Sequence, residues 1–128
     1  MKALNYLSII TVANLMISSV FSLAGIFSPS SLLPAGMPVN SSTIVFALYA
    51  AVRTIPLAIV ALFAIRMRDK KPILILAVLA GIIQFSDGFI GLYQRDLSKV
   101  IGPFVLAALT FIGIFMNWRT INAEESNA

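Results

Sequence analysis

The sequence predicts an all-α membrane protein in which four transmembrane helices form an antiparallel bundle. Of its 128 residues, 59% are hydrophobic and only 11% are charged, whereas soluble domains carry about 45–50% apolar and about 25% charged residues. A chain with so few charged side chains cannot cover its surface with groups that face water. Four segments are also long enough to cross a bilayer, since each crossing needs about 20 mainly apolar residues.

The four apolar segments follow one another with short connections. They run over Ala3–Phe27, Thr43–Ile65, Pro72–Tyr93 and Ile101–Trp118. The first connection contains SPSSLLPAGMPVN, whose three prolines and one glycine predict an uncharged loop on the membrane surface. The other two, RMRDKK and QRDLSK, are short enough to make consecutive helices antiparallel neighbours. We therefore predict one domain over residues 1–128.

Basic residues orient the predicted bundle. One end of the bundle contains both termini and the connection between the second and third spans. Its basic residues are Lys2, Arg66, Arg68, Lys70, Lys71 and Arg119. The opposite end has only Arg95 and Lys99. Because cytoplasmic segments carry an excess of lysine and arginine, we predict cytoplasmic termini and a location in the bacterial inner membrane. The first apolar run is longer than that of a signal peptide, so we expect it to be retained.

Missing residue types exclude several chemistries. The chain has no histidine and no cysteine, which removes disulfides, thiol chemistry and the common ligand sets of zinc, haem and iron–sulfur clusters. We therefore expect neither a metal nor a cofactor. The net charge of +4 is explained by topology-determining residues beside anionic lipid head groups and does not indicate nucleic-acid binding. Asn40 begins a glycosylation sequon, which we attribute to chance.

Two ionisable residues fall inside predicted spans, Arg53 in the second and Asp87 in the third. Charges in spans usually face the bundle interior and pair with one another. Arg53 lies roughly 20 Å along its helix from Arg66, and Asp87 lies roughly 22 Å from Pro72, at about 1.5 Å per residue. Both would then sit at the same depth in the outer half of the membrane. We predict an ion pair between them, at the centre of an intramembrane polar pocket.

Further polar side chains accompany this predicted pair. Gln84 shares one face of the third span with Asp87 and with the small residues Ala77, Gly81 and Gly91. We predict a set of ligand-binding residues on the first three spans: Asn14, Ser18, Tyr49, Arg53 and Gln84. Asp87 is the only candidate acid or base within the spans. The alternative is that the hydroxyl and amide groups serve only as hydrogen bonds between helices.

Three stretches of the chain resemble known families. AVRTIPLA, with an intramembrane arginine, SDGFIGLYQRD at the end of the third span and IGP at the start of the fourth resemble the DoxX-like group and related bacterial four-helix membrane proteins. This resemblance implies the four-helix fold and leaves the activity open. A more distant likeness is to four-span sterol-isomerase-type domains, in which intramembrane acids shuttle protons, although those sites are richer in histidine and glutamate.

The sequence therefore predicts a membrane protein that binds a lipid or a small amphipathic ligand, with Arg53 holding an anionic or carbonyl group beside Asp87. Three alternatives stay open. The protein is a membrane-embedded isomerase or cyclase that uses Asp87 as acid and base, a proton-coupled transporter that works as a homo-oligomer, or a helper subunit that binds another membrane protein through the third span. Whether it is an enzyme is not decided by the residues.

Overall fold

Four long helices account for most of the chain in the computed structural model, which describes residues 2–67 and 70–126, with side chains for 5–67 and 70–119. The long helices and one short 3₁₀-helix are α1 (Lys2–Phe27), η1 (Pro29–Ser31), α2 (Ser41–Met67), α3 (Lys70–Gln94) and α4 (Ser98–Ser126). Each long helix contains an apolar segment long enough to cross a membrane. These findings confirm the predicted all-α membrane fold.

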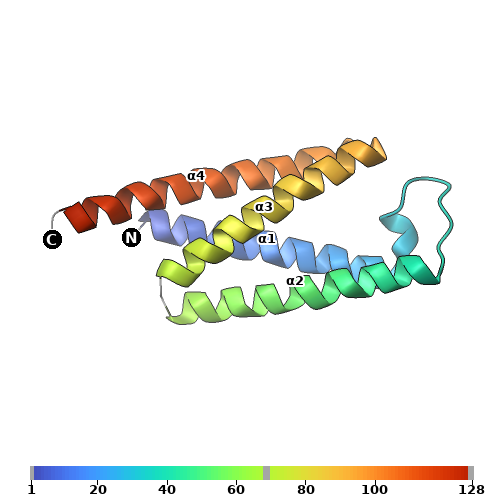
Figure 1. Ribbon diagram of the computed structural model, residues 1–128, viewed down its shortest axis with the longest axis horizontal. Helices are drawn as coiled ribbons and strands as arrows, with labels where there is room; N and C mark the ends of the chain where they lie inside the picture. Colours follow the sequence, from blue (N-terminus) through green and yellow to red (C-terminus); the bar gives the residue numbers. More distant parts are fainter. Residues whose placement is uncertain (1, 68–69, 127–128) are drawn as a thin grey trace.

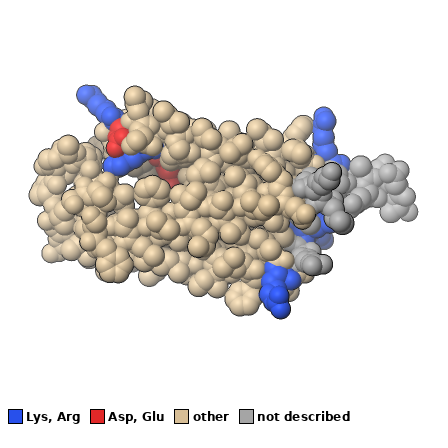
Figure 2. Space-filling model, turned by 180° about the vertical axis from the view of Figure 1, so that it is seen from behind, with Lys and Arg blue, Asp and Glu red and all other residues tan. Residues whose placement is uncertain are grey.

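The four helices run antiparallel along one long axis (Figure 1). The beginning of α1, the end of α4 and the junction of α2 with α3 lie together at one end, which we call the terminal end; η1 and the turn between α3 and α4 lie at the opposite end, the loop end. On the face drawn in Figure 2, charged side chains gather toward these two ends. Arg68 and the side chain of Lys2, which supported the predicted orientation, lie outside the described residues.

The helices pack as two close pairs. α2 lies chiefly along α1, and α3 lies chiefly along α4, whereas α2 and α3 touch each other little. The α3–α4 pair is close because glycines of α3 meet aromatic rings or backbone of α4. A Cβ atom at Gly88 would lie 2.8 Å from the Phe104 ring, and one at Gly91 would lie 2.3 Å from the Lys99 carbonyl oxygen. On α2, small residues form the buried face: Ala51, Ala58, Ala61 and Ala64.

Local capping explains why two helices begin earlier than predicted. Asn40 accepts a hydrogen bond from the Thr43 backbone N–H (3.0 Å) and so caps α2. Asp96 accepts hydrogen bonds from both the backbone N–H (3.1 Å) and the hydroxyl (2.6 Å) of Ser98, where α4 begins. These bonds, with that from the Ser98 hydroxyl as the largest cause, lower the pKa of the Asp96 carboxyl. Asparagine is common in turns, but Asn40 caps the first turn of a helix.

Candidate functional site

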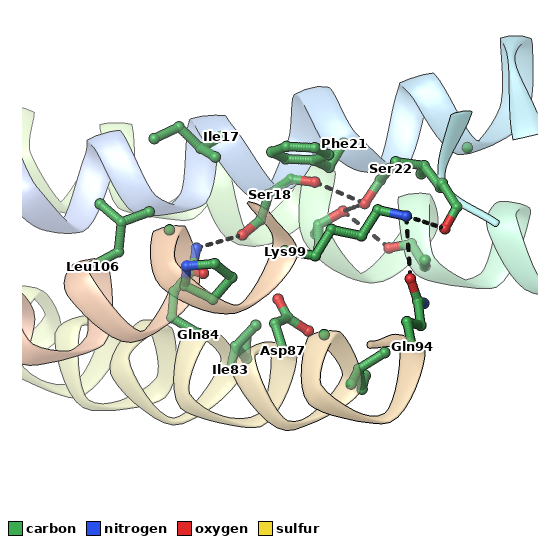
Figure 3. Close-up of a pocket in the computed structure, with 18 of the residues that line it drawn as sticks. Ile17, Ser18, Phe21, Ser22, Ile83, Gln84, Asp87, Gln94, Lys99 and Leu106 are labelled. Carbon is green, nitrogen blue, oxygen red and sulfur yellow. Dashed lines mark hydrogen bonds between the residues drawn. The ribbon is translucent and has the colours of Figure 1, made fainter. Parts of the chain in front are cut away.

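A cavity of about 710 Å³ opens between the helices in the half of the bundle nearest the loop end (Figure 3). All four helices and the η1 segment contribute to its wall. Its apolar lining includes Ile17, Phe21, Ile83, Ile90 and Leu106. Its polar lining includes Ser18, Ser22, Thr54, Gln84 and Asp87. The cavity thus combines apolar side chains with a few polar groups, as ligand sites commonly do.

Hydrogen bonds between helices connect several of the polar residues that line the cavity. The Gln84 amide nitrogen on α3 donates to the Ser18 hydroxyl on α1 (3.3 Å). The hydroxyls of Ser22 and Thr54 share a hydrogen bond of 2.7 Å between α1 and α2. Both contacts join helices through side chains that also line the cavity, so these groups hold the wall together and present oxygen and nitrogen atoms to its interior.

Asp87 differs from its polar neighbours because its carboxylate has no hydrogen-bond or ion-pair partner among the described residues. The side chain projects from α3 into the cavity, between Gln84 and Gln94 (Figure 3). Within the described part of the chain, the carboxylate forms neither a hydrogen bond nor an ion pair. Asp87 is partly buried and lies seven residues before the end of α3, roughly 10 Å along the helix. The structure therefore presents an acidic group to an internal space within the membrane-spanning region.

Lys99 crosses the mouth of the cavity from the first turn of α4 (Figure 3). Its ammonium group donates to the Leu32 carbonyl oxygen after η1 (2.9 Å) and to the Gln94 side-chain oxygen (3.1 Å). It also lies 3.4 Å from the Asp96 carboxylate. This side chain therefore ties the loop after α1 to the turn between α3 and α4. In the sequence, Lys99 contributes only to the predicted topology, and no pattern there indicates this contact.

The structure does not bring Arg53 and Asp87 together. Arg53 is exposed on α2 and does not line the cavity, and the same holds for Tyr49, which is 56% exposed. Among the side chains of 5–67 and 70–119, Arg53 makes no ion pair. A short connection makes two helices antiparallel, yet it does not require them to pack closely, and α2 packs on α1 instead of α3.

A signal for the orientation of Arg53 was present in the sequence. Ala51 belongs to the buried small-residue face of α2, and Arg53 follows it by two positions, about 200° around a helix of 3.6 residues per turn. Small residues let helices approach closely in membranes. The alanine spacing therefore indicates the packed face, and Arg53 lies at its margin with an exposed side chain.

Asn14 does not line the cavity. It is fully buried, and its amide nitrogen donates a hydrogen bond to the Thr110 hydroxyl on α4. The side-chain oxygens of Asn14 and Thr11 are buried, and neither has a hydrogen-bond partner among the residues that the structure describes. Of the six predicted site residues, the cavity therefore contains Ser18, Gln84 and Asp87, while Asn14 joins two helices.

Comparisons with protein-family models, curated proteins and solved structures find no match for this chain. The DoxX-like resemblance therefore stays a prediction. In the described residues, no three acidic, histidine or cysteine side chains lie close enough to hold a metal ion. The cavity, the unengaged carboxylate of Asp87 and the Lys99 contacts are the features on which a functional proposal can rest.

Proposed function

We propose that this membrane protein binds a small amphipathic molecule in the cavity, with a cationic amine of the ligand next to the Asp87 carboxylate. The observation that carries the proposal is the absence of any partner for Asp87 among the described residues. Ionisable groups within membrane spans usually pair with an opposite charge and mark ligand or ion pathways. A ligand ammonium group would supply the missing charge.

The form of the cavity supports an amphipathic ligand of modest size. Its volume of about 710 Å³ falls within the range of about 300–1,000 Å³ found for small-molecule sites. Ile17, Phe21 and Leu106 would contact the apolar part of the ligand, and Ser18 and Gln84 would offer hydrogen bonds beside Asp87. Arg53 and Tyr49 are not part of the proposed site, because neither lines the cavity.

Binding of three probes with the same chain length tests the proposal. Dodecylamine, dodecanol and dodecanoic acid differ only in their head groups, so their affinities for the purified protein can be compared by native mass spectrometry. We expect dodecylamine to bind most tightly, because only its head group neutralises Asp87. The Asp87→Asn variant should weaken dodecylamine binding by roughly tenfold, the effect of about 1.4 kcal/mol, and leave dodecanol unaffected.

Ser86→Ala is the matched control, because Ser86 is the exposed neighbour of Asp87 on α3 and its hydroxyl donates a hydrogen bond to the Ile82 carbonyl oxygen of the same helix. This variant should bind all three probes as the unchanged protein does. Equal affinities for amine and alcohol, or undiminished amine binding by Asp87→Asn, would contradict the proposal. Mass spectrometry of compounds that co-purify with the protein would then identify the natural ligand class.

The two alternatives that use Asp87 predict different additional results. A proton-coupled transporter would move protons across vesicle membranes when dodecylamine is added, and Asp87→Asn would abolish that movement. An isomerase or cyclase would convert a lipophilic substrate, and the same variant would bind it without turnover. Among the described lining residues Asp87 is the one acidic group, and both alternatives depend on it.

We also propose that the terminal end of the bundle faces the cytoplasm of a bacterial cell. Arg66, Lys70, Lys71 and Arg119 lie at this end, against Arg95 and Lys99 at the loop end, and cytoplasmic ends are enriched in basic residues. Because the chain has no cysteine, single cysteines can be introduced without background. A cysteine at Lys70 should react with impermeant reagents only from the cytoplasm, and one at exposed Ser30 only from outside.

A further inference from the structure

α2 carries a regular stripe of exposed side chains on the side that faces away from the bundle. It consists of Phe46, Tyr49, Arg53, Pro56, Val60 and Phe63, which we call the outer stripe. Successive members are alternately three and four residues apart, the spacing by which two helices pack along each other in a left-handed pair. Phe46 is 73% exposed and Phe63 is 64% exposed, so large side chains are available along most of α2.

Arg53 lies near the middle of this stripe and of the membrane span. It is 12 residues from Ser41 and 14 residues from Met67, roughly 18 and 21 Å along the helix. Arg53 therefore lies several helical turns from either end of α2. Arg53 also makes no hydrogen bond or ion pair with any residue that the structure describes. A guanidinium group at this depth calls for an anionic partner.

Charge complementarity decides which partner fits. A second copy of this chain packed on the same stripe in a parallel twofold pair would place Arg53 against Arg53 at equal depth. Asp87 of such a copy faces its own cavity and is not available. A different membrane protein with an acidic residue in the middle of a span satisfies both the spacing of the stripe and its charge.

We propose that the outer stripe of α2 binds a transmembrane helix of another membrane protein, whose mid-span carboxylate pairs with Arg53. This interaction surface consists of exposed side chains outside the small-residue face of α2, and none of them lines the cavity. It is independent of the proposed ligand. The partner is therefore defined by two properties, a helical span and an aspartate or glutamate near its centre.

Synthetic transmembrane peptides test this proposal directly. One peptide has a leucine–alanine span with a central aspartate, and its control has leucine at that position. The full-length protein carries a donor dye on a single cysteine at Ser42 and is reconstituted in phosphatidylcholine vesicles with acceptor-labelled peptide. We expect energy transfer to the aspartate peptide and weaker transfer to the leucine peptide.

Three variants locate the interaction on the stripe. Arg53→Leu should weaken association with the aspartate peptide by roughly tenfold, equivalent to about 1.4 kcal/mol, because it removes the charge that pairs with the aspartate. Arg53→Lys keeps the charge and should retain most of the association. Ile59→Ala is the matched control, because Ile59 is exposed on α2 outside the stripe, and it should behave as the unchanged protein does. Arg53→Leu replaces a charge by an apolar residue, so insertion of α2 is not at risk.

Three outcomes would overturn the proposal. The first is equal association of the aspartate and leucine peptides. The second is energy transfer between two labelled copies of the protein that Phe63→Ala abolishes, which would assign the stripe to a second copy. The third is energy transfer that depends on the phosphatidylglycerol content of the vesicles and not on the aspartate of the peptide. That result would mean that Arg53 pairs with lipid head groups.

Discussion

Asp87 and Arg53 are both charged residues within membrane-spanning helices, yet the structure gives them opposite surroundings. Asp87 lies on the face of α3 that packs in the bundle and projects into a cavity. Arg53 lies on the face of α2 that points away from the bundle and contacts no described polar partner. One charged side chain thus faces an internal cavity, and the other faces away from the bundle.

The side chains one turn away account for this difference. Gln84 lies three residues before Asp87 and Gly91 four residues after it, and both are buried. Tyr49 lies four residues before Arg53 and Pro56 three residues after it, and both are exposed. The burial of these neighbours matches the opposite surroundings of the two charged residues.

The largest effect that we predict is on membrane insertion of α2 when Arg53 is replaced, with little change in the stability of the folded protein. Arg53→Leu should favour membrane insertion of the α2 segment by about 3 kcal/mol, because arginine at a helix centre is strongly disfavoured and leucine is favoured. The unfolding free energy of the purified protein should change by less than about 0.5 kcal/mol, since an exposed side chain away from specific contacts contributes little.

A translocon insertion assay of the α2 segment measures the first quantity, and reversible unfolding of the full-length protein in detergent measures the second. Loss of more than about 1 kcal/mol of unfolding free energy in Arg53→Leu would mean that Arg53 has an internal partner. The contrast between the two charged residues would then disappear, and the outer stripe would lose its central argument.

A somewhat smaller effect is expected where α3 meets α4. A Cβ atom at Gly91 would lie 2.3 Å from the Lys99 carbonyl oxygen, so Gly91→Ala must push apart two backbones that position Asp87 and Lys99. We expect a loss of about 2–3 kcal/mol of unfolding free energy, the cost of overpacking a close contact.

Gly102→Ala is the control for this substitution, because a Cβ atom at Gly102 meets nothing within 4 Å. Alanine is the better helix former by up to about 1 kcal/mol, so this variant should equal or exceed the unchanged protein in stability. Both are measured by reversible unfolding in the same detergent. A Gly91→Ala variant as stable as Gly102→Ala would show that the α3–α4 contact is loose.

Most of the fold was accessible from the sequence, because the length and apolar composition of a span are local properties. The predicted segment Pro72–Tyr93 lies within α3 and differs from it by two residues at the beginning and one at the end. The earlier start of α2 depends on the side chain of Asn40. A polar residue outside the apolar run gives no hydropathy signal, although asparagine is a favoured N-cap.

The candidate site was predictable only in part. Ser18, Gln84 and Asp87 were found because polar residues at helical spacing on one face indicate the bundle interior. The position of Arg53 depends on which helices pair laterally, and connection length does not determine that. The contact of Lys99 with the Leu32 carbonyl joins residues 67 positions apart, and no local pattern predicts it.

The smallest expected effect tests the separation of the two charges directly. Arg53→Ala and Asp87→Ala, made singly and together, form a double-mutant cycle on unfolding free energy. Residues without contact or shared partners usually give changes that add within about 0.3–0.5 kcal/mol, and Arg53 lies outside the cavity that Asp87 lines. We therefore expect a coupling energy within that range. A larger coupling energy would support the ion pair that the equal depth of Arg53 and Asp87 on consecutive helices predicts. The ligand site and the outer stripe would then not be separate.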